Sequence, residues 1–234
     1  MPRVSSDFVI GPVRMPKVIA VMIAAIAVTS IAAAILGRNA GLSLASLLYL
    51  SPVDVFRGQV WRLLTWPLLE GDPLGLLFGC YTLFWVGRDL VNTWGQQRFL
   101  LRTLMLTLSA AVTTTALALV WPGLGAAGTW PVLDGLLVMW GLTFRTRTLN
   151  LYGLLPLTGL RLAQLTIGLT VLYAVFSGLA AFVPHFAAEG IALLWMIPIA
   201  RWQGSRKPDK KSAGPAQVFS FADWYEEHNK TKKN

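Results

Sequence analysis

The chain has 234 residues, a formal net charge of +9 at pH 7, 55% hydrophobic residues and only 13% charged residues. Soluble proteins carry about a quarter of charged residues, so the composition excludes a water-soluble domain, a disordered chain and a simple nucleic-acid-binding domain. The single cysteine, Cys80, excludes a disulfide framework and a cysteine-based metal site. The composition therefore predicts an all-α integral membrane protein with the lipid bilayer as a partner, with no nucleic acid and no metal or cofactor.

Six apolar runs are candidate membrane spans, because about 20 apolar residues cross a bilayer. They cover residues 18–36, 74–94, 99–121, 131–144, 160–182 and 185–200. The first is long enough to be a retained span rather than a cleaved signal peptide. The fourth and sixth are short and contain Asp134 and Glu189, so we expect both to be sheltered inside the bundle.

The segment of residues 37–73 between the first two spans is too long for a tight turn. Its stretch 42–50 is apolar, and its stretch 60–69 places Trp61 and Trp66 beside Arg62. Aromatic and basic side chains among leucines are typical of segments at the membrane surface. We therefore predict short helices in the outer membrane interface, with Trp61 and Arg62 fixing this long loop onto the bundle.

The distribution of basic residues predicts the orientation, because Lys and Arg accumulate in cytoplasmic connections. All but three of the 20 Lys and Arg residues fall on one side of a six-span layout; Arg38, Arg57 and Arg62 fall on the other. We expect both termini in the cytoplasm and the six spans in a bacterial inner membrane. The predicted parts are a cytoplasmic N-terminal segment (1–17), the membrane domain (18–200) and a basic cytoplasmic tail (201–234), read as a tether and a short amphipathic patch.

Four segments resemble, in order, motifs of the rhomboid superfamily. They are the pair Trp61-Arg62, residues 83–100 around Gly87 and Trp94-Gly95, Gly128 followed by Gly135-Leu136-Leu137, and Pro184-His185 with the small residues Ala188 and Ala192. The resemblance covers roughly residues 17–200. It implies a rhomboid-like bundle of six transmembrane helices with a long interfacial loop after the first, in which small residues let spans four and six pack closely.

Active rhomboid proteases use a serine in a Gly-x-Ser-Gly turn at the start of span four and a histidine in span six. Aligning on Gly135 puts Trp130 at the serine position, and aligning on residues 125–128 puts Ala127 there. Neither side chain is a nucleophile. His185 matches the histidine of the family but has no serine to deprotonate.

The family also uses a histidine and an asparagine in span two to stabilise the oxyanion, and these positions fall on Gly75 and Gly79. The resemblance therefore implies a rhomboid-like pseudoprotease without enzymatic activity. The connection of residues 144–155 is similar to that of derlins. This implies a protein that binds transmembrane segments of client membrane proteins, in membrane-protein quality control or trafficking.

Two alternatives remain open. One is an intramembrane protease with an unorthodox nucleophile such as Thr129, and the other is a small channel or proton-coupled carrier. Charged groups at membrane depth are costly, and His185 and Glu189 lie one helical turn apart. We therefore expect Asp134, His185 and Glu189 to form one polar cluster between spans four and six, as a structural lock, a ligand site or a proton relay.

Overall fold

The computed structural model describes residues 7–10, 13–39, 44–151 and 155–205. The chain forms two compact units, Met1–Pro198 and Ile199–Asn234. The described part of the second unit is the C-terminal end of the last helix. The tether and the amphipathic patch that the sequence predicts after that helix lie outside the described residues.

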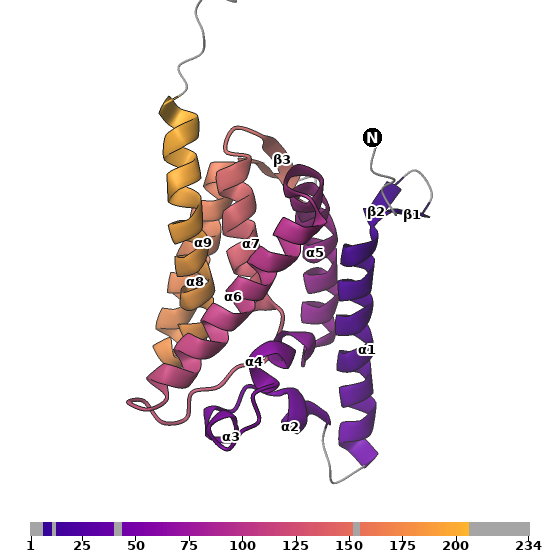
Figure 1. Ribbon diagram of the computed structural model, residues 1–234, viewed down its shortest axis with the longest axis vertical. Helices are drawn as coiled ribbons and strands as arrows, with labels where there is room; N and C mark the ends of the chain where they lie inside the picture. The colour runs from indigo at the N-terminus through magenta and orange to yellow at the C-terminus, as the bar shows by residue number, and fades with distance from the viewer. Residues whose placement is uncertain (1–6, 11–12, 40–43, 152–154, 206–234) are drawn as a thin grey trace, which may run out of the picture. The chain divides into compact units, whose positions relative to one another are not determined.

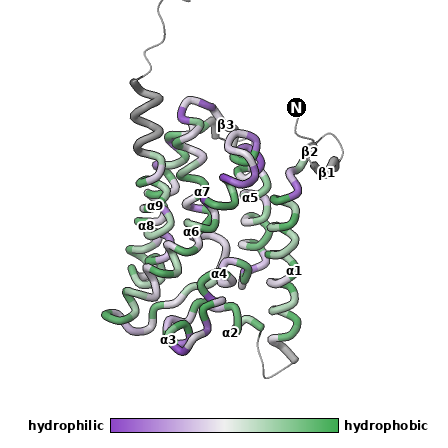
Figure 2. Tube along the Cα trace, viewed as in Figure 1, coloured by the Kyte–Doolittle hydropathy of each residue, from purple (hydrophilic) through white to green (hydrophobic). Residues whose placement is uncertain are grey.

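The first unit is built from long helices that run alternately up and down (Figure 1). They are α1 (Lys17–Asn39), α5 (Pro73–Trp94), α6 (Gln96–Leu117), α7 (Trp130–Thr143), α8 (Gly159–Ser177) and α9 (Leu179–Ser205), of which α9 belongs to this unit as far as Pro198. Five of them, all except α7, contain stretches long and apolar enough to cross a membrane. Apolar residues cover these helices over most of their length, as Figure 2 shows. The prediction of an all-helical, multi-pass membrane protein is therefore confirmed.

Short elements fill the connections. Between α1 and α5 the described chain forms α2 (Leu44–Leu48), α3 (Pro52–Phe56), α4 (Arg62–Thr65) and the 3₁₀ helix η1 (Trp66–Leu68). Two antiparallel hairpins pair β1 (Asp7–Ile10) with β2 (Val13–Pro16) and β3 (Thr148–Leu151) with β4 (Leu155–Thr158). The sequence analysis missed both hairpins, because four-residue strands are too short for an alternating pattern to stand out.

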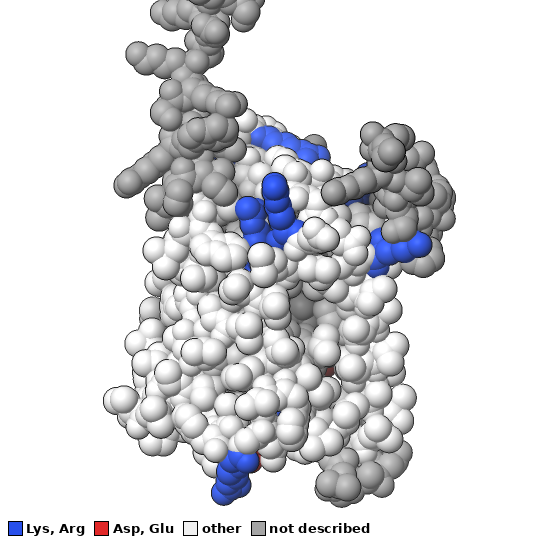
Figure 3. All heavy atoms as spheres, in the orientation of Figure 1, with Lys and Arg blue, Asp and Glu red and all other residues white. Residues whose placement is uncertain are grey.

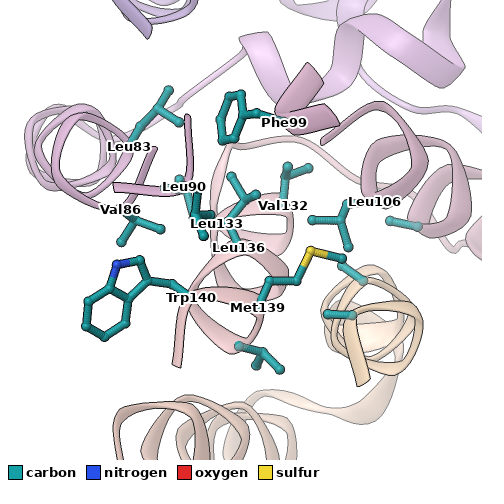
Figure 4. Close-up of a cluster of buried hydrophobic side chains, with 14 of the residues drawn as sticks. Leu83, Val86, Leu90, Phe99, Leu106, Val132, Leu133, Leu136, Met139 and Trp140 are labelled. Carbon is teal, nitrogen blue, oxygen red and sulfur yellow. The ribbon is translucent and has the colours of Figure 1, made fainter. Parts of the chain in front are cut away.

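The helix α7 lies in the centre of the core and packs against α5, α6 and α8. In Figure 4 its side chains Leu133, Leu136 and Met139 lie among those of α5 and α6, including Leu90 and Leu106. All five of these side chains are fully buried. The expected sheltering of the fourth predicted span is thus confirmed, and an apolar centre of this kind orders the helices around it.

The predicted boundary between the last two spans is wrong. The sequence analysis placed it near Pro184, but α8 ends at Ser177 and α9 begins at Leu179. Gly178 forms the break with φ of +95°, a conformation that glycine adopts readily. Pro184 lies inside α9, where it removes one hydrogen bond without ending the helix. The last helix is therefore 27 residues long, whereas the sequence analysis predicted a short span.

The predicted third span, residues 99–121, also differs from the structure. The helix α6 begins three residues earlier, at Gln96, because Gly95 makes the turn from α5 with φ of +82°. It ends at Leu117, and the next residues form turns.

The helices α7 and α8 approach closely at Gly141. A Cβ atom there would contact the Gly159 carbonyl oxygen and lie 2.8 Å from the Ala163 Cβ. We expect Gly141→Ala to lower the free energy of unfolding by about 2 kcal/mol, because backbone atoms cannot move aside cheaply. Gly168→Ala on α8 is the matched control, since a Cβ at Gly168 meets nothing within 4 Å. Unfolding curves in detergent that coincide for the two variants would contradict the close approach.

Candidate functional site

Asp134 and His185 form a direct contact between α7 and α9. The His185 Nδ1 atom lies 2.6 Å from Asp134 Oδ2, and the two side chains are 16% and 14% exposed. A carboxylate can only accept, so Nδ1–H donates to Asp134 in this geometry. The Phe182 ring lies 4.8 Å from the imidazole, centroid to centroid. This arrangement orients the imidazole and leaves Nε2 as the nitrogen that can act on another group.

Glu189 lies one turn beyond His185 on α9, and only 3% of its surface is exposed. Its Oε1 accepts a hydrogen bond of 2.7 Å from the Thr170 hydroxyl on α8. The three polar residues singled out by the sequence are thus near one another, but Glu189 has its partner on a third helix. Sequence reasoning missed Thr170, because threonines in spans usually bond to their own helix.

The chain just before α7 is held by the segment around η1. The Gly128 N–H donates to the Trp66 carbonyl at 3.3 Å, and Gly128 has φ of +102°, which favours glycine. The Thr129 hydroxyl, buried, donates to the Pro67 carbonyl at 3.0 Å. The hydroxyl considered as an unorthodox nucleophile is therefore already engaged as a backbone hydrogen-bond donor.

Glu70 is a site residue that the sequence analysis did not single out. Its Oε2 accepts a hydrogen bond of 3.1 Å from the Thr129 N–H, at the start of α7. A carboxylate is favourable at a helix N-terminus, where backbone N–H groups lack partners. A Cβ at Gly75 would lie 3.1 Å from Glu70 Oε1. The family resemblance places a hydrogen-bond donor for the oxyanion at Gly75. The neighbouring group in the structure is instead a hydrogen-bond acceptor, the Glu70 carboxylate.

Gly79 is the other position that the resemblance assigns to oxyanion stabilisation. It is buried in α5, and a Cβ there would lie 3.5 Å from Leu133 Cδ1. The space next to Gly79 is therefore filled by the apolar core.

Burial raises the pKa of the Glu70 carboxyl above its ordinary value of 4.5; hydrogen bonds from the Thr129 and Gly71 N–H groups lower it, and the Asp72 charge raises it. A raised pKa in the folded state means that protonation stabilises the fold, an effect lost as the pH rises through the folded pKa. We expect Glu70→Gln to remove this dependence, so the variant gains stability relative to the wild type as the pH rises from 4.5 toward neutrality. Thermal unfolding of both proteins across this pH range measures the difference in stability. If the stability of the two proteins changes with pH in the same way, the raised pKa of Glu70 is contradicted.

A cavity of about 640 Å³ lies beside these groups. Its walls come from α5, with Tyr81 and Trp85, and from α8, with Leu165 and Leu169, which flank α7 in Figure 1. Asp134 and His185 both line it, as does Glu70. Leu165 and Leu169 of its α8 wall are each 42% exposed, and Tyr81 of its α5 wall is 51% exposed, so the cavity is open to the outside at both of these helices.

The cavity also contains both positions at which a family serine is expected. Trp130 and Ala127 line it, and no serine or cysteine is found among the described residues that line it. Within the described ranges, no group of three or more His, Cys, Asp and Glu side chains is placed to hold a metal ion. The described lining thus combines an oriented imidazole with threonine and tyrosine hydroxyls, and contains no serine or cysteine side chain.

The small residues of the resemblance lie where the helices meet. A Cβ at Gly135 would lie 2.9 Å from Leu106 Cδ2 and 3.3 Å from the Ala188 carbonyl oxygen, so α7 approaches both α6 and α9. Ala188 and Ala192 are fully buried. Small side chains at this crossing bring α9 close enough to α7 for His185 to reach Asp134.

Trp61 and Arg62 hold the segment between α1 and α5 together. Arg62 is 4% exposed, and its Nη1 atom donates to the Ser46 and Tyr49 carbonyls at 2.5 and 2.6 Å. Its Nη2 lies 3.4 Å from Asp54 Oδ2. The Trp61 Nε1 donates to the Leu47 carbonyl at 3.3 Å. These bonds connect α2, α3 and α4, and the Leu50–Ala126 bridge connects this segment to the loop before α7.

Basic side chains gather at the end opposite to α3, over the starts of α1 and α6 (Figure 3). There Asp89 on α5 accepts from Arg147 at 2.8 Å and from the Trp140 indole at 3.2 Å. The Arg102 guanidinium lies 3.8 Å from the centroid of the Trp94 ring. Asp134 and His185 lie near the starts of α7 and α9, and the basic side chains lie over the starts of α1 and α6. The two groups therefore lie toward opposite ends of the helices.

A family model described as the rhomboid domain matches residues 57–201, which is well over half of the chain. The match includes Arg62, Gly128, Asp134 and His185. No curated protein was found to match the sequence. The resemblance seen in the sequence motifs is therefore confirmed at the level of the family, and the chain belongs to the rhomboid family.

Proposed function

We propose that this rhomboid-family protein is a non-catalytic membrane protein that binds transmembrane segments of client proteins through the cavity between α5 and α8. The observation that carries the proposal is the lining of that cavity. Trp130 and Ala127 line it at the two candidate serine positions, and the nearby Thr129 hydroxyl donates to a backbone carbonyl. Without a serine or cysteine among the described lining residues, the oriented His185 has no usual nucleophile to activate.

The shape of the cavity supports client binding. It is mostly apolar, and its exposed walls belong to α5 and α8, two helices long and apolar enough to cross a membrane. A neighbouring transmembrane helix can enter there without leaving the bilayer. Such a protein fits a role in membrane-protein quality control or trafficking, in line with the derlin-like connection after α7.

An intramembrane protease with an unorthodox nucleophile is the second candidate. It is favoured by one observation, the Asp134–His185 hydrogen bond, because a carboxylate that orients an imidazole is the base arrangement of many hydrolases. Glu70 argues against it, because its carboxylate at the start of α7 would repel a developing oxyanion near Gly75.

Two measurements in proteoliposomes separate the candidates. Incubation with a panel of rhomboid-cleavable transmembrane substrates is expected to yield no cleavage product. A photo-crosslinker at Leu169, which lines the cavity, is expected to capture these substrates. The same group at Leu172, exposed on α8 but outside the cavity lining, is the matched control and should capture far less. Cleavage that disappears in His185→Ala would establish the protease instead.

We further propose that α7 completes a six-span arrangement in a bacterial inner membrane, with both termini in the cytoplasm. The support is the basic surface at the end of the first unit where α1 begins. Reporter fusions at Arg38 and Asn234 are expected to lie in opposite compartments. Fusions that report the same compartment would rule out the arrangement.

A further inference from the structure

The described residues that line the α5–α8 cavity carry acidic groups and no basic side chain other than an imidazole. Glu70 and Asp134 contribute carboxyl groups, His185 contributes the imidazole, and no Lys or Arg is present among the described lining residues. Glu189 lies one turn further along α9. The electrostatic character of the cavity therefore favours a positively charged guest.

Aromatic rings surround the same space. Tyr81 and Trp85 come from α5, Trp130 from α7, Tyr173 from α8 and Phe182 from α9. The faces of such rings attract ammonium and guanidinium groups, most strongly where water is excluded. Rings together with carboxylates form a lining suited to an organic cation rather than to a purely apolar segment.

The polar groups lie at a defined depth. Asp134 is about one turn from the start of α7, and His185 is less than two turns from the start of α9. Both helices run from their starts toward the end that carries the basic surface. A guest cation in contact with these groups would therefore lie in the part of its own span remote from that surface.

We infer that the cavity selects client transmembrane helices that carry an Arg or Lys side chain in the third of the span nearest the starts of α7 and α9. The inference rests on the proposed function and names its client class. A cationic side chain in lipid is unfavourable, so a helix that carries one gains by moving it from the acyl chains into a cavity with carboxylates and aromatic rings. Charge complementarity thus distinguishes such a helix from an ordinary apolar span.

The test uses the full-length protein in neutral phosphatidylcholine vesicles at pH 8, with synthetic helices of about 23 Leu and Ala residues. One series carries a single Arg in the outer, middle or inner third of the helix, where the outer third is the one nearest the starts of α7 and α9. Arg is used because its side chain stays charged. A second series carries Gln at the same positions, and the parent helix carries neither. Energy transfer between labelled helix and labelled protein measures binding. We expect the outer-third Arg helix to bind at least about tenfold more tightly than the parent, its Gln counterpart or the inner-third Arg helix.

Variants assign the effect to the cavity. Glu70→Gln is expected to weaken binding of the outer-third Arg helix at least about threefold while leaving the parent helix unaffected. Asp72→Asn is the matched control, because it removes a carboxylate two residues away, outside the cavity lining, and keeps an N-cap for α5. Tyr173→Leu provides a second test that leaves the carboxylates in place and removes one ring.

The outcomes separate this inference from the proposed function. If the parent and Arg helices bind equally, or if Gln replaces Arg without loss, client binding stands and the selection for cations is wrong. If no helix binds, the proposed function itself fails. Preference for Arg that persists unchanged in both Glu70→Gln and Tyr173→Leu would place the binding site elsewhere on the protein.

Discussion

Arg62→Ala is expected to lower the free energy of unfolding by about 4 kcal/mol. The guanidinium is buried and donates to the carbonyls of Ser46 and Tyr49 and to Gln59 Oε1, and it pairs with Asp54. Alanine would leave two partly buried carbonyls and one carboxylate without this partner. Because Arg62 on α4 contacts both α2 and α3, the whole segment should loosen before the helices separate.

The measurement is equilibrium unfolding in detergent micelles, combined with limited proteolysis of the segment between α1 and α5. Arg57→Ala is the matched control, because Arg57 also contacts Asp54, at 3.6 Å, but 72% of its side chain is exposed. An exposed ion pair is worth little, so the change should be within about 0.5 kcal/mol. Equal losses for the two variants would show that the buried network does not hold this segment.

Asp134→Ala is expected to lower the free energy of unfolding by about 3 kcal/mol, because it leaves the partly buried His185 without its partner. His185→Ala should cost a similar amount, since it leaves the carboxylate unpaired. The double variant should then be more stable than the sum of the two losses predicts, by at least about 1 kcal/mol. Removing both members of a buried pair is less harmful than stranding one of them.

A double-mutant cycle monitored by thermal unfolding in detergent checks this result. Thr170→Val combined with Asp134→Ala is the control cycle, because the Thr170 bond goes to Glu189 rather than to Asp134. That cycle should show a smaller coupling than the Asp134–His185 cycle. Strict additivity in the Asp134–His185 cycle would mean that the 2.6 Å contact contributes nothing to stability.

Much of the architecture follows from residue patterns that are local in the chain. The apolar runs place five helices long enough for the membrane, because crossing hydrocarbon requires about 20 apolar residues in a row whatever the neighbours are. The motifs around Arg62, Gly128 and His185 were sufficient to recognise the family before any contact was known. Asp134 and His185 could be paired in advance because buried polar groups at membrane depth require partners.

Other features depend on contacts between distant parts of the chain, and the sequence alone did not decide them. Gly178 rather than Pro184 separates the last two helices, because a proline inside a helix costs one hydrogen bond whereas the left-handed conformation at Gly178 redirects the chain. Glu70 reaches the start of α7 across 59 residues of sequence, and Thr170 reaches Glu189 from another helix. The sequence determined which segments are apolar enough for the membrane and which motifs they carry; the cavity arises only when α5, α7, α8 and α9 pack together, because its lining is shared among side chains that no local pattern brings side by side.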